Sequence, residues 1–469
     1  MKAPWARWSC AAIAGLWGAA AVHYANRELP AGMRLDGAPQ SVPSRAVTFL
    51  DDITGADAYD HGFSSHAIFD AMLRNIGAAR SLVVLDCHLC SDPHRDAPDA
   101  IAQLTPMASQ LIDALLARKA AIPQLQILVI ADPVNELDSS APGPELARLG
   151  AAGIRVITVD LSALRDRNVL LGPPSRLIAR LTGRSWAQLA RLKSSSRRVL
   201  ICDDGHGVLT ALTGTAEPAM ASSIDTVTAL QVSGPAVLPL LRSELTLARD
   251  FGWSGAITVP VAEAASAPGV ESDTLDLRWL GEGAIRDALL EHLSAATQGD
   301  SIDIASDSLS DRRLIGALLA ASRRGATVRM ILDPHKSTSL WGSGNQTVGS
   351  ELIAASDGRI RVAWYRTHSE QFRAALVLIH GNGPTWMVTG SASMTRRDLG
   401  DYDLTLAAAL SESIPTEALV SAQAFFDTLW NDRGPPGIEY TADADAWADP
   451  SQLRYWTYRL MELLGLSRT

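Results

Sequence analysis

An internal repeat constrains the fold of this chain more than any other feature. In each half, a helical pattern leads to an apolar strand-like run, and a second helix and strand follow. Strands that alternate with helices of this length predict parallel sheets covered by helices. We therefore expect an α/β fold of two lobes, each a largely parallel sheet flanked by helices, packed as an intrachain pseudo-dimer. The matching segments are 68–86 and 285–305, then 111–133 and 314–334.

The repeat continues to the end of each half and fixes the predicted boundaries. A strand and a Gly-Ser/Thr-Ala segment at 198–216 recur at 375–393. The region between the halves is rich in Ala, Pro, Gly and Ser without periodicity, which is typical of a linker. The predicted organisation is an N-terminal segment 1–25, a first lobe 45–253, a linker 254–275, a second lobe 276–435 and a C-terminal tail 436–469 with a docked helix.

Composition excludes one class of partner. The 469 residues are 47% hydrophobic and 20% charged, as in packed globular proteins. Lys and Arg number 41 against 51 Asp and Glu, and the formal net charge is -10. Such a chain has no long-range field that attracts a polyanion, so we expect no nucleic-acid partner.

The N-terminal segment indicates on which side of a membrane the protein lies. Lys2 and Arg7 precede the apolar run 8–22, and flanking positive charges stay in the cytoplasm, which sends the rest of the chain outward. The run falls short of the ~20 residues that span a bilayer, and 19–21 would suit a signal peptidase. A cleaved signal and a retained single-pass anchor both remain open, although aromatic residues at its ends favour the anchor.

A CxxC motif offers a metal-binding alternative. Cys87 and Cys90 lie close to His88 and His94. Residues three apart on a strand point to opposite faces, and no second CxxC completes four ligands. The pattern therefore favours a buried strand, and no metal is predicted.

Two copies of a strand followed by a Gly-Ser/Thr-Ala segment resemble the phospholipase D superfamily, which carries HxKxxxxD and a downstream GSxN in each half. The likeness runs from Tyr24 to the C-terminus and is greatest to the membrane-anchored bacterial branch. It is carried by 161–166, 364–372, 390–402 and 458–462. The resemblance implies a site in which one imidazole attacks phosphorus and another protonates the leaving oxygen, without any cofactor.

Both signature motifs are degenerate. In the first, Ser196 stands at the histidine position, Arg198 at the lysine and Asp203 at the aspartate. In the second, Arg373 replaces the histidine, Ala375 the lysine and His380 the aspartate. The asparagine of GSxN is replaced by Glu217 and by Ser393. By the same resemblance, the phosphate-binding residues would be Arg197, Arg198, Thr215, Arg373, Ser391 and Ser393.

These replacements decide the expected chemistry. A serine hydroxyl without an adjacent base is a weak nucleophile, and a guanidinium that stays protonated cannot shuttle a proton. We therefore expect a catalytically silent, membrane-associated protein that binds a phospholipid, another phosphodiester or a protein partner. The alternatives are an active phosphodiesterase or phosphatidyl transferase working through His368 or His380, and an interaction module whose cleft holds no ligand.

Overall fold

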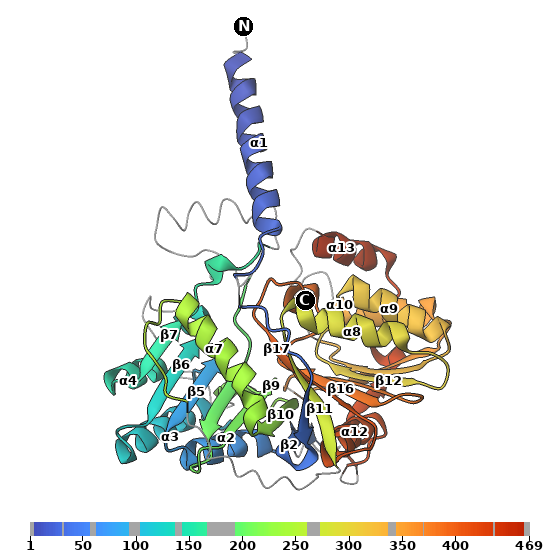
Figure 1. Ribbon diagram of the computed structural model, residues 1–469. Helices are drawn as coiled ribbons and strands as arrows, with labels where there is room; N and C mark the ends of the chain where they lie inside the picture. Colours follow the sequence, from blue (N-terminus) through green and yellow to red (C-terminus); the bar gives the residue numbers. More distant parts are fainter. Residues whose placement is uncertain are drawn as a thin grey trace.

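The computed structural model describes residues 4–30, 32–56, 62–92, 104–136, 143–166, 193–259, 273–335, 344–368, 370–434 and 437–463. Two α/β lobes lie side by side, and helix α1 (Pro4–Ala25) projects from the body (Figure 1). The predicted two-lobed α/β fold is confirmed. His94, considered above as a metal ligand, lies outside the described residues.

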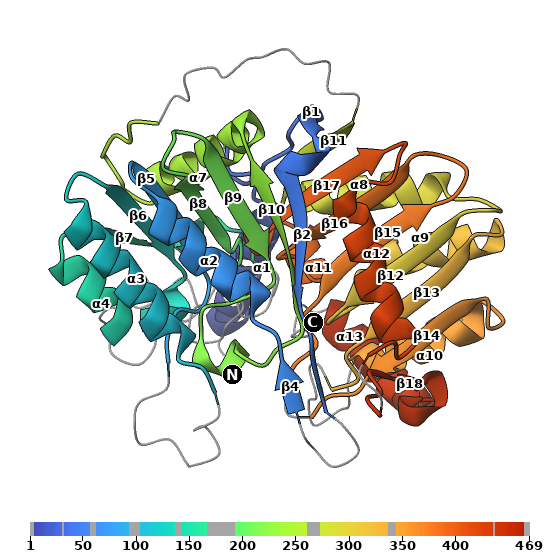
Figure 2. The same ribbon diagram turned by 90° about the horizontal axis from the view of Figure 1, so that it is seen from below.

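The first lobe is built on a seven-stranded sheet, whose core strands are buried on both faces. In spatial order its strands are β2 (Val47–Asp52), β10 (Val227–Ser233), β9 (Leu209–Gly214), β8 (Val199–Asp203), β5 (Leu82–Cys87), β6 (Gln126–Ala131) and β7 (Arg155–Thr158). A separate pair, β3 (Thr54–Ala56) and β4 (Gly62–Ser64), extends below the body in Figure 2.

The second lobe repeats this plan in a nine-stranded sheet. In spatial order its strands are β1 (Gln40–Pro43), β11 (Thr274–Gly281), β17 (Leu406–Glu412), β16 (Thr385–Gly390), β15 (Ala375–His380), β12 (Ser301–Ser306), β13 (Thr327–Leu332), β14 (Ile360–Tyr365) and β18 (Thr441–Asp443). The two edge strands come from outside the predicted second lobe: β1 precedes the first lobe, and β18 belongs to the tail.

The expectation of largely parallel sheets needs correction. Among the described strands, parallel pairing is confined to β5–β6 and β6–β7 in the first sheet and to β12–β13 and β13–β14 in the second. The other pairings are antiparallel, including β8 with β5 and β15 with β12. A strand buried on both faces reads as a continuous apolar run in either direction, so the sequence pattern did not separate the two arrangements.

Helices cover both faces of each sheet in corresponding ways. On one face of the first sheet lie α2 (Ala67–Ala78), α3 (Met107–Ala121) and α4 (Pro144–Ala151), with α7 (Leu238–Asp250) on the other. On the second sheet, α8 (Gly283–Ala295), α9 (Arg312–Arg323) and α10 (Gly344–Ala355) lie opposite α12 (Glu417–Trp430). The short α11 (Arg396–Leu399) and the terminal α13 (Gln452–Leu463) complete the second lobe.

The lobes share one hydrophobic core. The sheet faces that carry α7 and α12 contribute to the same buried cluster. Helix α12 packs on β2 of the first lobe, where the rings of Phe49 and Phe425 are 6.0 Å apart. This continuous core holds the inner ends of the two sheets in a fixed relation, which positions the site described below.

Helix α1 stands apart from this core. Its side chains Leu16 and Val22 are 72% and 62% exposed. Among the described residues, no helix is both long and apolar enough to cross a membrane.

Candidate functional site at the junction of the lobes

The two degenerate motifs meet across an approximate two-fold axis. The backbone N–H of Ser196 donates to Leu404 O at 2.7 Å, and that of Arg373 donates to Thr226 O at 2.8 Å. Each motif therefore bridges to a segment of the opposite lobe. The sequence repeat predicts such a relation, because two similar halves pack most simply about a shared axis.

Buried carboxylates hold both motif segments in place. Asp132 Oδ2 accepts from the Ser195 N–H at 2.5 Å, and Asp333 Oδ2 accepts from the Phe372 N–H at 3.2 Å. Across the junction, Asp403 Oδ1 accepts from the Ser194 N–H at 2.8 Å. These carboxylates position the backbone of the two motifs.

A pocket of about 160 Å³ opens where the motifs meet. We call it the central pocket. Most of the site residues that the resemblance implies line it together, and they come from both lobes: Ser196, Arg198, Thr215, Arg373, Ser391 and Ser393. The structure thus brings together six of the residues that the resemblance named.

An internal carboxylate joins the two key arginines. Arg198 Nε and Nη2 donate to Glu217 Oε1 at 2.9 and 2.6 Å. Arg373, from the opposite lobe, donates through Nη1 to Glu217 Oε2 at 3.0 Å, and its Nη2 lies 2.7 Å from Oε1. Glu217 is only 4% exposed. Its carboxylate therefore takes the bidentate contacts that these guanidinium groups would offer a phosphate.

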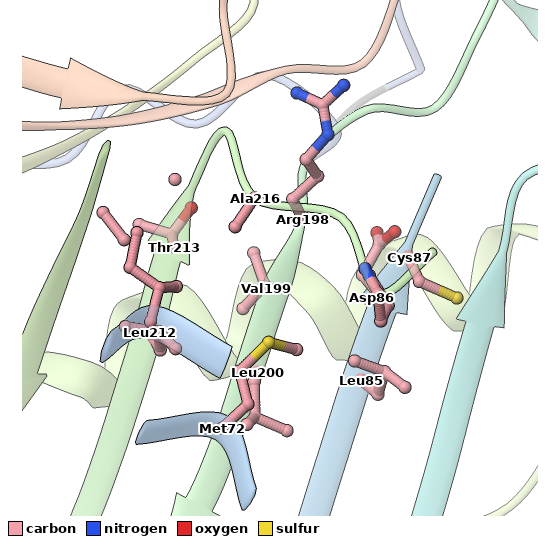
Figure 3. Close-up of a pocket in the computed structure, with 14 residues that line it drawn as sticks. Met72, Leu85, Asp86, Cys87, Arg198, Val199, Leu200, Leu212, Thr213 and Ala216 are labelled. Atoms are coloured by element: carbon pink, nitrogen blue, oxygen red, sulfur yellow. The ribbon is translucent and has the colours of Figure 1, made fainter. Parts of the chain in front are cut away.

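The backbone at Arg198 shows why its side chain reaches this position. Its φ of 51° is a left-handed conformation that non-glycine residues adopt at a cost of about 1 kcal/mol or more. Figure 3 shows the guanidinium pointing away from the small apolar pocket of about 20 Å³ between the first sheet and α2. This turn sends Arg198 toward the second lobe, where its Nη1 also donates to Ser391 O at 3.1 Å.

Electrostatics fix the charge of the central pocket. Burial opposes ionisation of Glu217, but Arg373 and Arg198 outweigh it and hold its pKa well below the ordinary value. Burial and the neighbouring Asp403 raise the pKa of Asp398 to about 6. The carboxylates in and around the pocket therefore match or exceed its cations at neutral pH. They are Glu217, Asp307, Asp398 and Asp403, against Arg198, Arg373 and Arg397.

Arg197 lies outside the central pocket, although the sequence grouped it with the phosphate-binding residues. It is fully buried, with Nη2 2.9 Å from Glu282 Oε1 and Nη1 3.1 Å from Glu244 Oε1. Its Nη2 also donates to Met33 O at 2.5 Å. Because residues 197 and 198 point in opposite directions at the start of β8, only Arg198 lines the pocket.

The other predicted residues also lie away from the pocket. Asp203 accepts from the backbone N–H groups of Ser81 and Leu82 at 2.8 and 2.9 Å, so it fixes the start of β5. His380 ends β15, with Nε2 4.0 Å from Asp303 Oδ2. His368 pairs with Glu370 at 3.6 Å and is not among the pocket-lining residues.

Sequence reasoning missed one imidazole that does line the central pocket. His88 directly follows β5, and its Nδ1 lies 3.5 Å from Asp132 Oδ2. Its proximity to Cys87 and Cys90 had suggested metal chemistry, but both thiols are buried. The usable signal was its place at the carboxyl end of a strand, where α/β proteins gather functional groups. Within the described residues, no group of three or more His, Cys, Asp or Glu side chains is arranged to hold a metal ion.

A second missed group surrounds Ser194. Its hydroxyl donates to Asp403 Oδ2 at 2.9 Å, accepts from Arg397 Nη2 at 2.9 Å and lies 3.2 Å from Ser196 Oγ. Arg397 Nε also donates to Asp403. Each of these polar groups is thus already bonded within the protein.

Comparisons with known proteins fit this architecture. Residues 289–430 match the family model of the phospholipase D-like domain of cardiolipin synthase. The crystal structure of phosphatidylserine synthase from Haemophilus influenzae covers 92% of this chain and 97% of its own, with a TM-score of 0.56 at 9% identity. Residues 289–430 therefore match a phospholipase D-like domain, and the fold of the chain is similar to that of phosphatidylserine synthase.

Two further solved structures match with lower scores. Polyphosphate kinase from Porphyromonas gingivalis gives a TM-score of 0.47 at 13% identity, over 89% of this chain and 53% of its own. Nuc, a phospholipase D family member from Salmonella typhimurium, gives 0.26 at 19% identity, over 34% and 93%. No curated protein matches the chain.

Proposed function

We propose that this chain is a catalytically silent phospholipase D-like protein that works at a phospholipid membrane by binding rather than by hydrolysis. The observation that carries the proposal is Glu217, whose carboxylate bridges Arg198 and Arg373 in the central pocket. To take the bidentate contacts of both guanidinium groups, a phosphodiester would have to displace a buried, doubly paired carboxylate. Breaking such a pair costs about 3–5 kcal/mol.

The nucleophile is lacking as well. Ser196 stands at the first histidine position, and within the described residues no imidazole hydrogen bonds to its hydroxyl; its neighbour is Ser194 Oγ at 3.2 Å. Arg373 stands at the second histidine position. Burial lowers its pKa, but the carboxylates of Glu217 and Asp225 outweigh burial and leave the pKa raised. It therefore remains a cation and cannot serve as an acid or a base near neutral pH.

The class of ligand is proposed from similarity and location. The matching family model and the structure that covers most of this chain both bear the names of phospholipid synthases. Helix α1 exposes Leu16, Trp17 and Val22 and projects from the body (Figure 1). We propose that α1 tethers the protein to the membrane, with the body on the extracytoplasmic side.

A second candidate function rests on His88. Its imidazole lines the central pocket, and Nδ1 lies 3.5 Å from the buried carboxylate of Asp132 without a hydrogen bond in the described structure. A carboxylate behind an imidazole orients it as a general base, which is the arrangement that Ser196 lacks in its own motif. Under this candidate the protein is an active phosphodiesterase whose imidazole has moved from the motif to the end of β5.

One experiment separates the two candidates. The full-length protein is incubated with a chromogenic phosphodiester and with phosphatidylglycerol vesicles, beside its His88→Ala, Ser196→Ala and Arg373→Ala variants. We expect no turnover above the buffer rate from any of them. Turnover by the wild type that disappears in His88→Ala would contradict catalytic silence and establish the second candidate.

A further inference from the structure

A second pocket, of about 360 Å³, lies next to the central one and is dominated by arginines. We call it the basic pocket. Helix α11 separates the two: Arg396 lines the basic pocket, while Arg397 and Asp398 line the central pocket. The arginines come from both lobes and from the C-terminal tail. They are Arg165, Arg286, Arg312, Arg313, Arg396 and Arg459.

Only part of this positive charge is compensated. Arg312 forms a bidentate pair with Glu351 at 2.6 and 2.5 Å, and Arg165 lies 3.3 Å from Asp401. Arg286 is 3.6 Å from Asp311, and its buried Nε has no hydrogen-bond partner in the described structure. Among the described residues, the carboxylates on or beside the pocket are therefore fewer than its arginines. They are Asp311, Glu351, Asp401 and Glu462.

Neutral groups hold the remaining arginines in position. Arg396 Nη1 donates to the backbone carbonyl of Glu462 at 3.0 Å, and Arg459 Nη1 donates to Tyr455 Oη at 2.7 Å. Arg313 is solvent-exposed. None of the three forms an ion pair with a carboxylate in the described part of the chain. Their charge is thus oriented but not neutralised, as an anion-binding site requires.

Helix α13 places an apolar surface beside this pocket. Arg459 and Leu463 line the pocket, and the helix exposes Leu453 and Trp456 at 77% and 64%. Leu460 and Leu463 are exposed at 55% and 74%. A helix that combines arginines with exposed Trp and Leu is typical of segments that lie in a membrane interface. Large exposed apolar residues gathered on one short helix also call for a partner surface.

The basic pocket, α13 and α1 share one side of the molecule. In Figure 1, α13 lies on the side of the body from which α1 projects. The chain just after α1 contacts the pocket directly, because Arg165 Nε donates to Arg27 O at 2.6 Å. The neighbouring Asp166 N–H donates to Tyr24 O at 3.1 Å. A membrane that held α1 would therefore face both the pocket and α13.

We propose that the basic pocket binds the phosphate group of an anionic phospholipid in a bilayer, with the exposed side chains of α13 inserted among the lipids. Guanidinium groups match phosphate oxygens bidentately, and the exposed apolar neighbours favour a phosphate that is carried by a bilayer. The proposal rests on the proposed function only for the class of ligand. It does not depend on whether the central pocket turns over a substrate.

The test is flotation of the full-length protein with vesicles of phosphatidylcholine alone or mixed with phosphatidylglycerol. We expect the wild type to prefer the anionic vesicles. Arg313→Glu and Arg396→Gln should weaken this preference by about fivefold for each unit of charge changed. Trp456→Ser should reduce binding to both vesicles. The matched control is Arg74→Glu, which reverses the charge of an exposed arginine on α2, away from the pocket.

The outcomes distinguish the sources of the phosphate. If Arg74→Glu lowers the preference as much as Arg313→Glu, total charge explains binding and the proposal fails. It also fails if inorganic phosphate stabilises the protein through Arg313 and Arg396 while the vesicles show no preference, since the site would then take a free anion. Turnover of phosphodiesters, measured separately, would overturn catalytic silence and leave this proposal standing.

Discussion

The central and basic pockets are neighbours that differ in how far their arginines are neutralised by carboxylates. In the central pocket, Arg198 and Arg373 share Glu217, and Arg397 pairs with Asp403. In the basic pocket, Arg313, Arg396 and Arg459 face no described carboxylate within ion-pair distance. Both contain arginines from the two lobes, yet only one retains surplus charge. An arginine at a phosphate-binding position of the family therefore indicates phosphate binding only if no carboxylate of the protein already pairs with it.

Burial explains why the two designs have different consequences. Glu217 is 4% exposed, so its pairs form in a low-dielectric setting where an uncompensated charge is costly. Arg313 lies at the surface, where solvent screens its charge and little energy depends on a partner. The ion pairs of the central pocket thus hold the fold together, whereas the exposed arginines of the basic pocket remain available to a ligand.

Removal of the bridging carboxylate should have the largest effect. Glu217→Ala leaves Arg198 and Arg373 as buried cations without their shared partner, and we expect a loss of about 3–5 kcal/mol in the free energy of unfolding. The measurement is urea denaturation followed by circular dichroism. The matched control is Glu351→Ala, whose partner Arg312 is 30% exposed, with an expected loss of about 1 kcal/mol or less.

Replacement of Glu217 by the family's asparagine sharpens the same comparison. In Glu217→Asn, added inorganic phosphate should restore part of the lost stability, because it can take the place of the carboxylate between the arginines. Equal unfolding free energies for wild type and Glu217→Ala would show that the bridge does not hold the lobes together.

A smaller effect concerns pH in the central pocket. Burial and Asp403 raise the pKa of Asp398 to about 6, above the ordinary value near 4. Between these values the folded protein binds more protons than the unfolded chain, so this residue makes stability fall as pH rises from about 4 to about 6. Asp398→Asn should remove that contribution. The free energy of unfolding of this variant should exceed that of the wild type by about 1–2 kcal/mol at pH 7.5 but not at pH 4.

Unfolding at several pH values checks this expectation. Other carboxylates with raised pKa, such as Asp52 at about 7, contribute to the wild-type slope, so the difference between variant and wild type is the relevant quantity. Asp113→Asn serves as the control, because Asp113 is 62% exposed. A constant difference between Asp398→Asn and wild type across this range would show that Asp398 does not titrate as described.

The repeat made the architecture predictable from sequence. Matching strands such as 82–87 and 301–306 fix two sheets of the same plan, and motif position placed Ser196 and Arg373 at their junction. Strand direction was not predictable, because a fully buried strand carries the same apolar pattern in a parallel or an antiparallel pair.

The features that decide function depend on three-dimensional contacts. Nothing in the sequence around Glu217 shows that it accepts from Arg373, which lies 156 positions away. Arg197 and Arg198 are chemically equivalent in sequence, and only the left-handed backbone at Arg198 sends them to different environments. The basic pocket draws arginines from separate segments of the chain, so no local motif marks it.

The smallest expected effect tests the other side of the comparison. Arg313→Glu and Trp456→Ser should each change the free energy of unfolding by about 0.5 kcal/mol or less. Both side chains are exposed to solvent, and that of Trp456 is 64% exposed. Denaturation in urea without vesicles measures this. A loss above about 1 kcal/mol would mean that these side chains have structural partners in solution, and reduced vesicle binding by the variants would then reflect a weakened fold. Unchanged stability with reduced vesicle binding would instead assign them to recognition of the membrane, which is the role that unpaired charge and exposed apolar surface can serve together.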